Sequence, residues 1–328
     1  MLQILLITVL LLALYIANQI YLYFKRNDAP ILRGNLICNI SYKKGQKLDL
    51  YQPTTKIHHK APVLIYFHGG GWVFGSKKAV NNARFNAAFN HLREQGYAII
   101  SPSYTLAKSG KSPFPACIDD ANHTLLWIEQ NADKYNFDID NIGIMGESAG
   151  AHIGMMSSYG SVSNLASPHS LSINYMISIY GPTELFQLYK DLMPFLSGLK
   201  ERAKKMPGIF QKRFNVAQNL FGFNPINDAD RTEVFAKQYS PYHKLTKTAP
   251  NTLIIHGDRD QLVPISQSLL LKERLDALGI PNMLKIFKGV GHALRGATFA
   301  QRQMIQNHIT GFVLDHYTAK TDAAKSMF

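Results

Sequence analysis

The chain has 328 residues, of which 46% are hydrophobic and 17% are charged. This balance is typical of a globular protein and excludes an intrinsically disordered chain or a collagen-like repeat. Lysine and arginine outnumber aspartate and glutamate by 35 to 22, so the formal net charge is +13. A basic balance of this size is compatible with an acidic partner or an anionic membrane surface. With only two cysteines, Cys38 and Cys117, a disulfide scaffold and a four-cysteine zinc site are excluded.

The N-terminal segment is apolar on every side. Residues 2–24 carry no charged side chain, and a bilayer-spanning helix needs about 20 residues. The run ends in aromatic residues, which are typical of a membrane interface, and Lys25 and Arg26 follow it. A secretory signal peptide would carry basic residues before its apolar stretch, and none stands there. We therefore predict an uncleaved, single-pass membrane anchor over residues 1–28.

The basic residues near this run predict its orientation. Lys25, Arg26 and Arg33 all follow the apolar run. Because positively charged flanks stay on the cytoplasmic side, the large C-terminal part is expected in the cytoplasm. That compartment is reducing, so both cysteines are expected to be free thiols.

Short apolar runs alternate with helical patterns through the rest of the chain. Residues 39–53 are predicted to form a hairpin that turns around Gly45. We expect strands over 62–67, 97–101, 142–145, 173–180, 252–256 and 283–287, and helices over 79–95, 118–131, 264–278 and 297–317. Strands that alternate with helices imply parallel crossovers and a sheet covered on both faces. This predicts one α/β domain over residues 29–318, followed by a C-terminal tail over 319–328.

One interval interrupts the alternation of strands and helices. Residues 184–242 contain no predicted strand and are helical in pattern, aromatic and basic, which indicates a helical lid inserted over the edge of the sheet. Within it, residues 190–214 interleave basic and apolar side chains, as an interfacial membrane surface does. The alternative is a solvated basic face on an ordinary lid.

The motif Gly146-Glu147-Ser148-Ala149-Gly150 follows a predicted strand and opens a predicted helix. A Gly-x-Ser-x-Gly turn in this position holds the serine in a strained conformation, and the flanking glycines keep other side chains out of the turn. The serine hydroxyl then projects from the carboxyl edge of the sheet. The pattern also arises by chance, so its place between strand and helix is what favours Ser148 as a nucleophile.

The motif His68-Gly69-Gly70-Gly71 directly follows another predicted strand. Three consecutive glycines expose backbone N–H groups, which suits the stabilisation of a developing oxyanion. A phosphate-binding glycine loop is the competing interpretation. Such a loop would show Gly-x-Gly-x-x-Gly or a Lys-Ser/Thr pair, and neither is present here.

Two further candidates lie near the C-terminus, each just after a predicted strand. A serine nucleophile needs a general base, and the base needs a carboxylate that fixes its tautomer. Asp260 and His292 supply these groups, and the chain order Ser148, Asp260, His292 is the order of the α/β-hydrolases. Loops that follow parallel strands converge at one edge of the sheet. Asp258 stands two residues before Asp260 and competes with it as the acid.

Together these motifs resemble the hormone-sensitive-lipase-like branch of the α/β-hydrolases, the esterase and lipase family that carries HGGG. The chain is similar to bacterial and plant carboxylesterases and to kynurenine-formamidase-like enzymes over residues 38–318. The resemblance implies an α/β-hydrolase fold, with a mostly parallel eight-stranded sheet flanked by helices. It implies these roles: Ser148 as nucleophile, His292 as base, Asp260 as acid, the N–H groups of Gly70, Gly71 and Ala149 as oxyanion donors, His68 as orienter of the glycine loop, and Gly69, Gly146 and Gly150 as motif support.

The function that the resemblance implies is a serine carboxylesterase that acts through an acyl-enzyme, with a small or lipophilic ester as substrate. No metal and no organic cofactor are expected. An amide hydrolase, either a formamidase or a peptidase, would use the same triad, and the shape of the pocket decides between the two. A membrane-tethered binding protein with a degenerate hydrolase fold is a further alternative. Nucleic-acid binding is not expected, because no recognition module is visible.

Four other polar residues have simpler interpretations. His152 lies one helical turn after Ser148 and is expected to be structural. Glu147, beside the nucleophile, is expected to make a scaffold contact or to adjust the charge of the site. Asp119 and Asp120 open a predicted helix and are expected to cap it rather than take part in catalysis.

Overall fold

A computed structural model describes residues 34–81, 84–108, 110–160, 169–192 and 216–318. The predicted anchor over residues 1–28 and the predicted tail over 319–328 lie outside this part of the chain, as do residues 193–215 of the predicted insertion. Within the described ranges, no helix combines the length and the apolar character needed to cross a bilayer. The anchor and the limits of the domain remain predictions.

Eight strands in the described residues form one sheet, in the order β1-β2-β4-β3-β5-β6-β7-β8. The pairs β1–β2 and β2–β4 are antiparallel, and every other pair of neighbours is parallel. The predicted mostly parallel eight-stranded sheet is therefore confirmed. The strands are β1 (Leu36–Lys43), β2 (Gln46–Tyr51), β3 (Ala61–Phe67), β4 (Ala98–Pro102), β5 (Phe137–Glu147), β6 (Tyr175–Ile179), β7 (Asn251–Gly257) and β8 (Asn282–Phe287).

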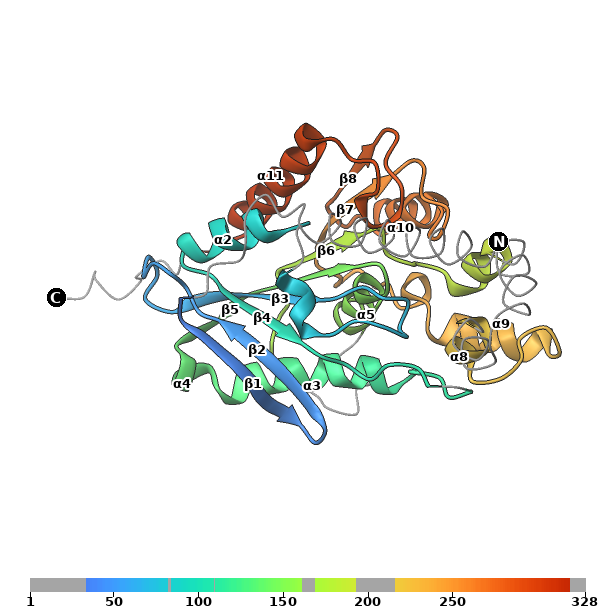
Figure 1. Cartoon of the computed structure of the whole chain (residues 1–328), viewed down its shortest axis with the longest axis horizontal. Coiled ribbons are helices and arrows are strands. Elements are labelled where there is room, and N and C mark those ends of the chain that lie inside the picture. The colour runs from blue at the N-terminus through green and yellow to red at the C-terminus, as the bar shows by residue number, and fades with distance from the viewer. Residues whose placement is uncertain (1–33, 82–83, 109, 161–168, 193–215, 319–328) are drawn as a thin grey trace, which may run out of the picture.

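Helices cover both faces of this sheet, as Figure 1 shows. The described helices are η1 (Lys77–Asn81), α2 (Asn86–Glu94), α3 (Ala116–Gln130), α4 (Ala132–Tyr135), α5 (Ala149–Ser158), α8 (Val216–Phe221), α9 (Ala229–Gln238), η3 (Pro241–His243), α10 (Ser266–Ala277), η4 (His292–Leu294) and α11 (Phe299–Asp315). Strand β3 is buried throughout, and its side chains alternate between the two faces. Val63 and Phe67 join α3, α5 and α10 in one core, while Leu64 and Tyr66 join α2 and α11 in the other.

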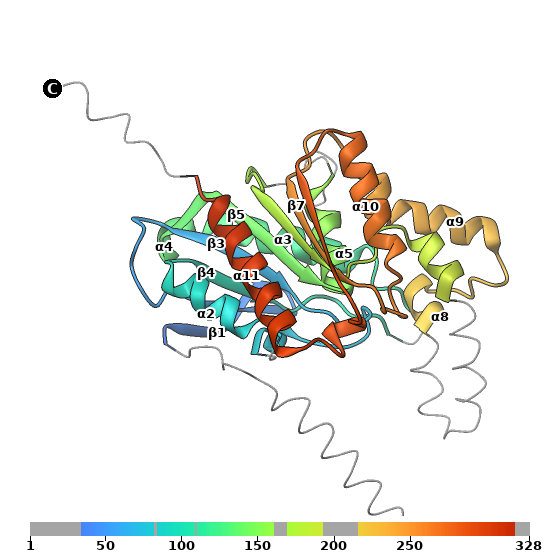
Figure 2. The ribbon, with the colours of Figure 1, turned by 90° about the horizontal axis from the view of Figure 1, so that it is seen from above.

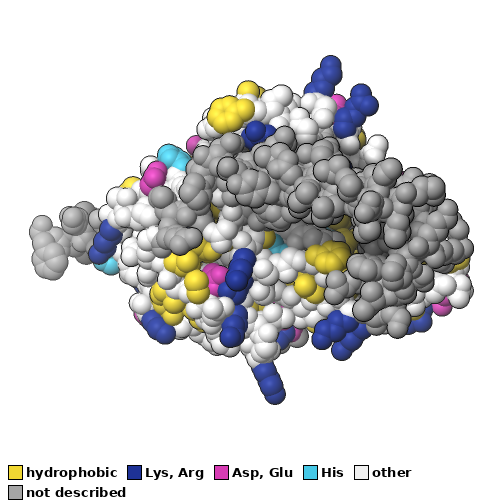
Figure 3. All heavy atoms as spheres, viewed as in Figure 1, with side chains coloured by type: hydrophobic (Ala, Val, Ile, Leu, Met, Phe, Trp, Pro, Cys, Tyr) yellow, Lys and Arg dark blue, Asp and Glu magenta, His cyan; other side chains and the backbone are white. Residues whose placement is uncertain are grey.

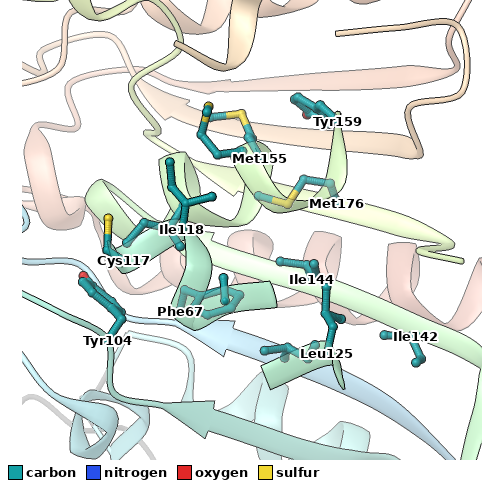
Figure 4. Packing of buried hydrophobic residues seen from close by; sticks show 14 of the residues in the cluster. Phe67, Tyr104, Cys117, Ile118, Leu125, Ile142, Ile144, Met155, Tyr159 and Met176 are labelled. Carbon is teal, nitrogen blue, oxygen red and sulfur yellow. The ribbon is translucent and has the colours of Figure 1, made fainter. Parts of the chain in front are cut away.

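The core on the α5 side is drawn in Figure 4, where Phe67 and Ile144 of the sheet lie near Ile118 of α3 and Met155 of α5. Every residue of α5 from Ala149 to Ser157 is buried. A helix that is buried on all sides is held by neighbours in every direction, because protein interiors are close-packed. The start of α5, and the turn before it, are therefore rigidly placed.

The structure corrects two of the predicted elements. The helix predicted over residues 79–95 is wrong as a single element, because α2 begins only at Asn86, after the short 3₁₀ helix η1. Side chains compete with the helix there: Asn86 donates to the carbonyl of Asn81, and Arg84 reaches inward to Glu147. Strand β5 begins at Phe137, five residues before its predicted start at 142.

The described part of the predicted insertion contains no strand. Residues 185–192, α8, α9 and η3 are all helical, and Figures 1 and 2 show α8 and α9 together at one end of the molecule. Aromatic rings join this end to the body. The ring centroid of Phe235 in α9 lies 6.1 Å from that of Phe114, and the ring of Tyr239 stacks on Phe114 with a centroid distance of 5.0 Å. The helical character is as expected, while its function as a lid remains a prediction.

Candidate active site

The turn at Ser148 has the strained geometry that its motif predicts. Ser148 lies between the end of β5 and the start of α5, with φ 53° and ψ −123°. Positive φ is unfavourable for a residue with a side chain and persists only where the surroundings impose it. A Cβ at Gly146 would collide with the backbone of Gly150, and a Cβ at Gly150 would collide with the carbonyl oxygens of Phe67 and His68. Both flanking glycines are therefore required for this turn.

The fold brings Ser148, His292 and Asp260 into one hydrogen-bonded chain. Ser148 Oγ lies 3.1 Å from His292 Nε2, and His292 Nδ1 lies 2.7 Å from Asp260 Oδ2. A carboxylate only accepts hydrogen bonds, so Nδ1 carries the proton and Nε2 is free to accept from the serine hydroxyl. This is the tautomer that a histidine base needs in order to remove a proton from serine.

Asp260 stays ionised despite its burial. Its side chain is 1% exposed, which opposes ionisation, but hydrogen bonds from His256, His292 and the N–H of Val263 outweigh the burial and hold the carboxyl pKa well below its usual range. Its other oxygen, Oδ1, accepts the N–H groups of Leu262 and Val263, each at 2.9 Å. Both oxygens therefore have fixed partners.

Asp258, the competing acid, is placed elsewhere. Its Oδ1 accepts the N–H of Gly289 at 2.6 Å, which ties together the two loops that carry Asp260 and His292. Asp260 therefore contacts the imidazole of His292, whereas Asp258 makes a structural hydrogen bond with the loop that begins at Gly289.

The glycine loop lies directly against the serine turn. A Cβ added at Gly69 would meet the side chain of Glu147 at 3.2 Å. Gly70 and Gly71 adopt φ values of 132° and 58°, which favour glycine. No described residue accepts a hydrogen bond from the N–H of either glycine. Ala149 opens α5, where an N–H group has no acceptor within the helix. The glycine loop and the start of α5 thus each offer N–H donors that are not used by the described residues.

His68 makes contacts within this loop rather than with Ser148. Its Nδ1 donates to the carbonyl of Gly69 at 2.8 Å, and its ring stacks on Tyr104 at 4.3 Å. Tyr104 in turn donates its hydroxyl to the carbonyl of His68 at 2.8 Å. Burial lowers the pKa of His68, so the ring stays neutral. These contacts hold the start of the glycine loop.

Glu147 is the centre of a buried polar cluster that the sequence did not predict. Its carboxylate accepts from Tyr66 at 2.8 Å, from Tyr180 at 2.5 Å and from Arg84 Nη2 at 2.5 Å. Burial raises its pKa, but the charge of Arg84 and these hydrogen bonds reverse the effect and lower it to about 2. The ring of Tyr180 lies 5.0 Å from that of His292. No local pattern links these residues, because they come from four different segments.

His152 lies in an aromatic wall next to the serine turn. Its Nε2 bonds to the carbonyl of Tyr239 at 2.7 Å, and its ring lies 5.2 Å from Trp72 and 5.3 Å from Phe114. Burial lowers its pKa to about 4, so the ring is neutral at physiological pH. These contacts are those of a structural histidine.

The expectation that Asp119 and Asp120 cap a helix is wrong. Pro115 occupies the N-cap position of α3, and no side chain caps it. Instead, Lys43 bonds to Asp119 at 2.6 Å and to Asp120 at 2.8 Å. Asp120 also accepts the N–H of Thr105 at 2.7 Å. The two carboxylates therefore tie the β1–β2 hairpin to α3.

Within the described ranges, no three histidine, cysteine, aspartate or glutamate side chains are grouped so as to hold a metal ion. Cys38 and Cys117 are both free thiols. On the face in Figure 3, the coloured Lys and Arg side chains are scattered, some at the edge and some near the middle, and do not gather in one patch.

Comparisons with known proteins identify the family of this chain. The family model described as BD-FAE matches residues 48–275. Esterase LipC of Mycobacterium tuberculosis is 28% identical over 71% of this chain and 53% of its own length. Esterase LipQ of the same organism is 24% identical over 88% of this chain and 64% of its own length. The chain thus spans between half and two thirds of these relatives.

A solved structure shares the fold. A thermophilic esterase from the Planctomycetes species Thermogutta terrifontis is 22% identical and superposes with a TM-score of 0.62, over 88% of this chain and 97% of its own. At this level of identity the likeness concerns the fold alone. The family model, in contrast, covers more than half of the chain and includes the glycine loop, the serine turn and Asp260. The chain therefore belongs to the BD-FAE family, among the esterases and lipases of the α/β-hydrolase class.

Proposed function

We propose that this protein is a serine carboxylesterase that hydrolyses carboxylic esters through an acyl-enzyme. The observation that carries the proposal is the hydrogen-bonded chain from Ser148 Oγ through His292 to Asp260, with distances of 3.1 and 2.7 Å. The names of the relatives LipC and LipQ, both esterases, support the same reaction.

The proposed reaction proceeds in two steps. As Ser148 Oγ attacks the ester carbonyl, His292 Nε2 takes the serine proton, and the N–H groups of Gly70, Gly71 and Ala149 stabilise the oxyanion. The tetrahedral intermediate collapses, and the alcohol leaves with the proton from His292. Water then attacks the acyl-enzyme with His292 again as base, and the carboxylic acid and free Ser148 are released.

Replacing the nucleophile tests the proposal directly. Ser148→Ala is expected to lower kcat on a p-nitrophenyl ester by about 10⁶-fold, which is typical for loss of a triad serine. A fluorophosphonate probe should label the wild-type chain and leave the variant unlabelled. Ser157→Ala, at a buried serine of the same helix, is the control and should keep its labelling. Equal labelling of the Ser148→Ala variant would place the nucleophile elsewhere.

The alternative function is an amide hydrolase, which would use the same triad to cleave an amide bond instead of an ester bond. Ester and anilide substrates with identical acyl groups separate the two, because only the leaving group differs. We expect kcat/KM to be higher for the ester at every acyl chain length from two to twelve carbons. A higher kcat/KM for the anilide would assign the protein to the amide hydrolases.

We further infer that residues 1–28 anchor the chain in a membrane as a single pass, with the hydrolase body in the cytoplasm. The support is the uncharged run at 2–24 and the basic residues Lys25 and Arg26 that follow it. The full chain is expected to stay in the membrane pellet after an alkaline carbonate wash and to be released by detergent. Protease added to intact cells should leave the body uncut. Release by carbonate alone would contradict the anchor.

A further inference from the structure

A second histidine lies against the acid of the triad. His256 is the penultimate residue of β7 and is fully buried. Its Nε2 lies 2.8 Å from the carbonyl oxygen of Val263 and 3.5 Å from Asp260 Oδ2. Its Nδ1 lies 2.6 Å from the hydroxyl of Ser268, in the first turn of α10. Neither the serine turn nor the glycine loop accounts for these contacts.

The partners of His256 determine which nitrogen carries its proton. At Nε2, both neighbours are acceptors, since a carbonyl and a carboxylate have no proton to give. Nε2 must therefore carry hydrogen. The hydroxyl of Ser268 can donate to Nδ1 when that nitrogen carries no hydrogen. Ser268 thus completes the hydrogen bonding of His256 in the Nε2–H tautomer.

The Nε2 proton of His256 links this ring to the loop that holds Asp260. His256 Nε2–H binds the carbonyl of Val263, while the N–H of Val263 donates to Asp260 Oδ1 at 2.9 Å. The loop from 260 to 263 is therefore held on both sides. Oδ2, which faces His256, is the oxygen that accepts from His292 at 2.7 Å. The orientation of the carboxylate is consequently coupled to a side chain that does not itself contact Ser148.

We propose that His256, held by Ser268, is a positioning residue that orients the carboxylate of Asp260 toward His292. The inference rests on the proposed function, because it assigns His256 a part in the same reaction. Its effect is on kcat: a misplaced acid leaves substrate binding intact but weakens the base at the moment of proton transfer. Displacements of about 1 Å in a catalytic group typically cost up to about 100-fold in rate.

Two amide variants of the full chain test the proposal. The amide nitrogen of glutamine is as many bonds from Cβ as Nε2 of histidine is, so glutamine can place an N–H where His256 Nε2–H stands. The amide nitrogen of asparagine is only as far from Cβ as Nδ1 of histidine, so asparagine cannot. We expect His256→Asn to lower kcat on a soluble p-nitrophenyl ester by 10- to 100-fold with KM unchanged. His256→Gln is expected to keep kcat within a few-fold of the wild type. The control is His58→Asn, which removes a similar histidine–carbonyl contact, with Gln95 at 3.1 Å.

Nuclear magnetic resonance of the chain with ¹⁵N-labelled histidine gives a readout that needs no substrate. His256 should show the Nε2–H tautomer, and the Nδ1 proton of His292 should resonate far downfield because it is bonded to Asp260. That signal should persist in His256→Gln and be lost in His256→Asn. An Nδ1–H tautomer for His256, or an unchanged signal and kcat in His256→Asn, overturns the proposal. If the wild type hydrolyses no ester, the proposed function is wrong. The His256 tautomer and the His292 Nδ1 proton signal would still show whether His256 positions Asp260.

Discussion

The carboxylate of Asp260 has a separate task for each of its oxygens. Oδ1 accepts hydrogen bonds from two backbone N–H groups, and Oδ2 accepts a hydrogen bond from His292 Nδ1–H. In Asp260→Asn, one of the two positions becomes an NH₂ group, which cannot accept from Nδ1–H and favours the wrong tautomer of His292. A loss of about 10⁴-fold in kcat is expected, as for the same change in another serine triad. Steady-state hydrolysis of a p-nitrophenyl ester measures it.

Asp258→Asn is the matched control for this substitution. Asp258 accepts the N–H of Gly289, away from the imidazole of His292, and an asparagine oxygen can accept that same bond. The kcat of the Asp258→Asn variant is therefore expected to stay within about 10-fold of the wild type, because a small displacement of the loop is the only effect expected. A larger loss in Asp258→Asn than in Asp260→Asn would reverse the assignment of the acid.

The ion pair between Arg84 and Glu147 is the second residue-scale feature with a measurable consequence. The side chain of Arg84 is 16% exposed and that of Glu147 is 2% exposed. Arg84→Met leaves a buried carboxylate without its counter-charge, which typically costs about 3–5 kcal/mol of folding free energy. Urea unfolding at pH 7 measures the loss. Lys272→Met breaks an exposed pair with Asp276, whose side chains are 40% and 51% exposed, and should cost less than about 1 kcal/mol.

The same variant changes how stability depends on pH. The pKa of Glu147 is lowered to about 2, so its contribution is fully present above the pKa of an unfolded glutamate, about 4.5, and is lost as the pH falls toward 2. Without Arg84, burial still raises that pKa while the lowering effects of the Arg84 charge and hydrogen bond are gone, so acid removes less of this contribution. Arg84→Met should therefore lose less stability than the wild type between pH 4.5 and 2. An equal acid-induced loss in both proteins would show that Arg84 does not hold the Glu147 charge.

At the scale of elements, the contact between the glycine loop and α5 depends on a missing Cβ. In Gly150→Ala the new methyl group would overlap the carbonyl oxygens of Phe67 and His68, so β3 and α5 must separate. Such overpacking typically costs about 1–3 kcal/mol. The displacement moves Ser148 relative to the oxyanion donors, and we expect kcat to fall about 100-fold. Ester hydrolysis and urea unfolding measure the two effects.

Gly311→Ala in α11 is the control for that substitution. A Cβ added at Gly311 meets nothing within 4 Å. Alanine is favoured over glycine inside a helix by about 1 kcal/mol, so this variant should be slightly more stable and fully active. If both variants lost activity alike, steric contact at the serine turn would not be the cause.

At the scale of the whole molecule, the buried His152 makes stability sensitive to mild acid. Burial lowers its pKa to about 4, so the folded chain holds it neutral while the unfolded chain protonates it below about 6.5. The unfolded state then binds more protons, and stability is lost as the pH falls from about 6.5 to 4. The loss is about 3 kcal/mol, at 1.36 kcal/mol per pKa unit.

His152→Met removes this titration. Its free energy of unfolding, measured in urea at pH 7 and pH 5, should change less with pH than that of the wild type. His91→Met alters an exposed histidine of α2 and should retain the acid sensitivity of the wild type. If the His152→Met variant lost as much stability in acid as the wild type, the sensitivity would arise from another group.

How well the sequence predicted each element depended on how local its determinants are. Strands β3 and β7 were predicted to within one residue at each end, because a buried parallel strand is a continuous apolar run. The serine turn was predicted because its two glycines leave the space it needs within five residues. The helix predicted over 79–95 was wrong because the side chain of Arg84 is committed to Glu147, 63 residues away in the chain.

The sequence by itself determined the alternation of strands and helices, the serine turn, the glycine loop and the set of candidate partners for Ser148. All of these depend on neighbouring residues or on a period of two or 3.6 residues. The tertiary structure showed the contact of Asp260 with His292 that the family resemblance implied. It alone decided that Asp119 and Asp120 bind Lys43, and that Arg84, Tyr66 and Tyr180 surround Glu147. The position of His256 against Asp260 likewise emerged only in three dimensions. The physical reason is that a hydrogen bond needs its atoms within about 3 Å, and for residues on separate segments only the folded chain sets that distance.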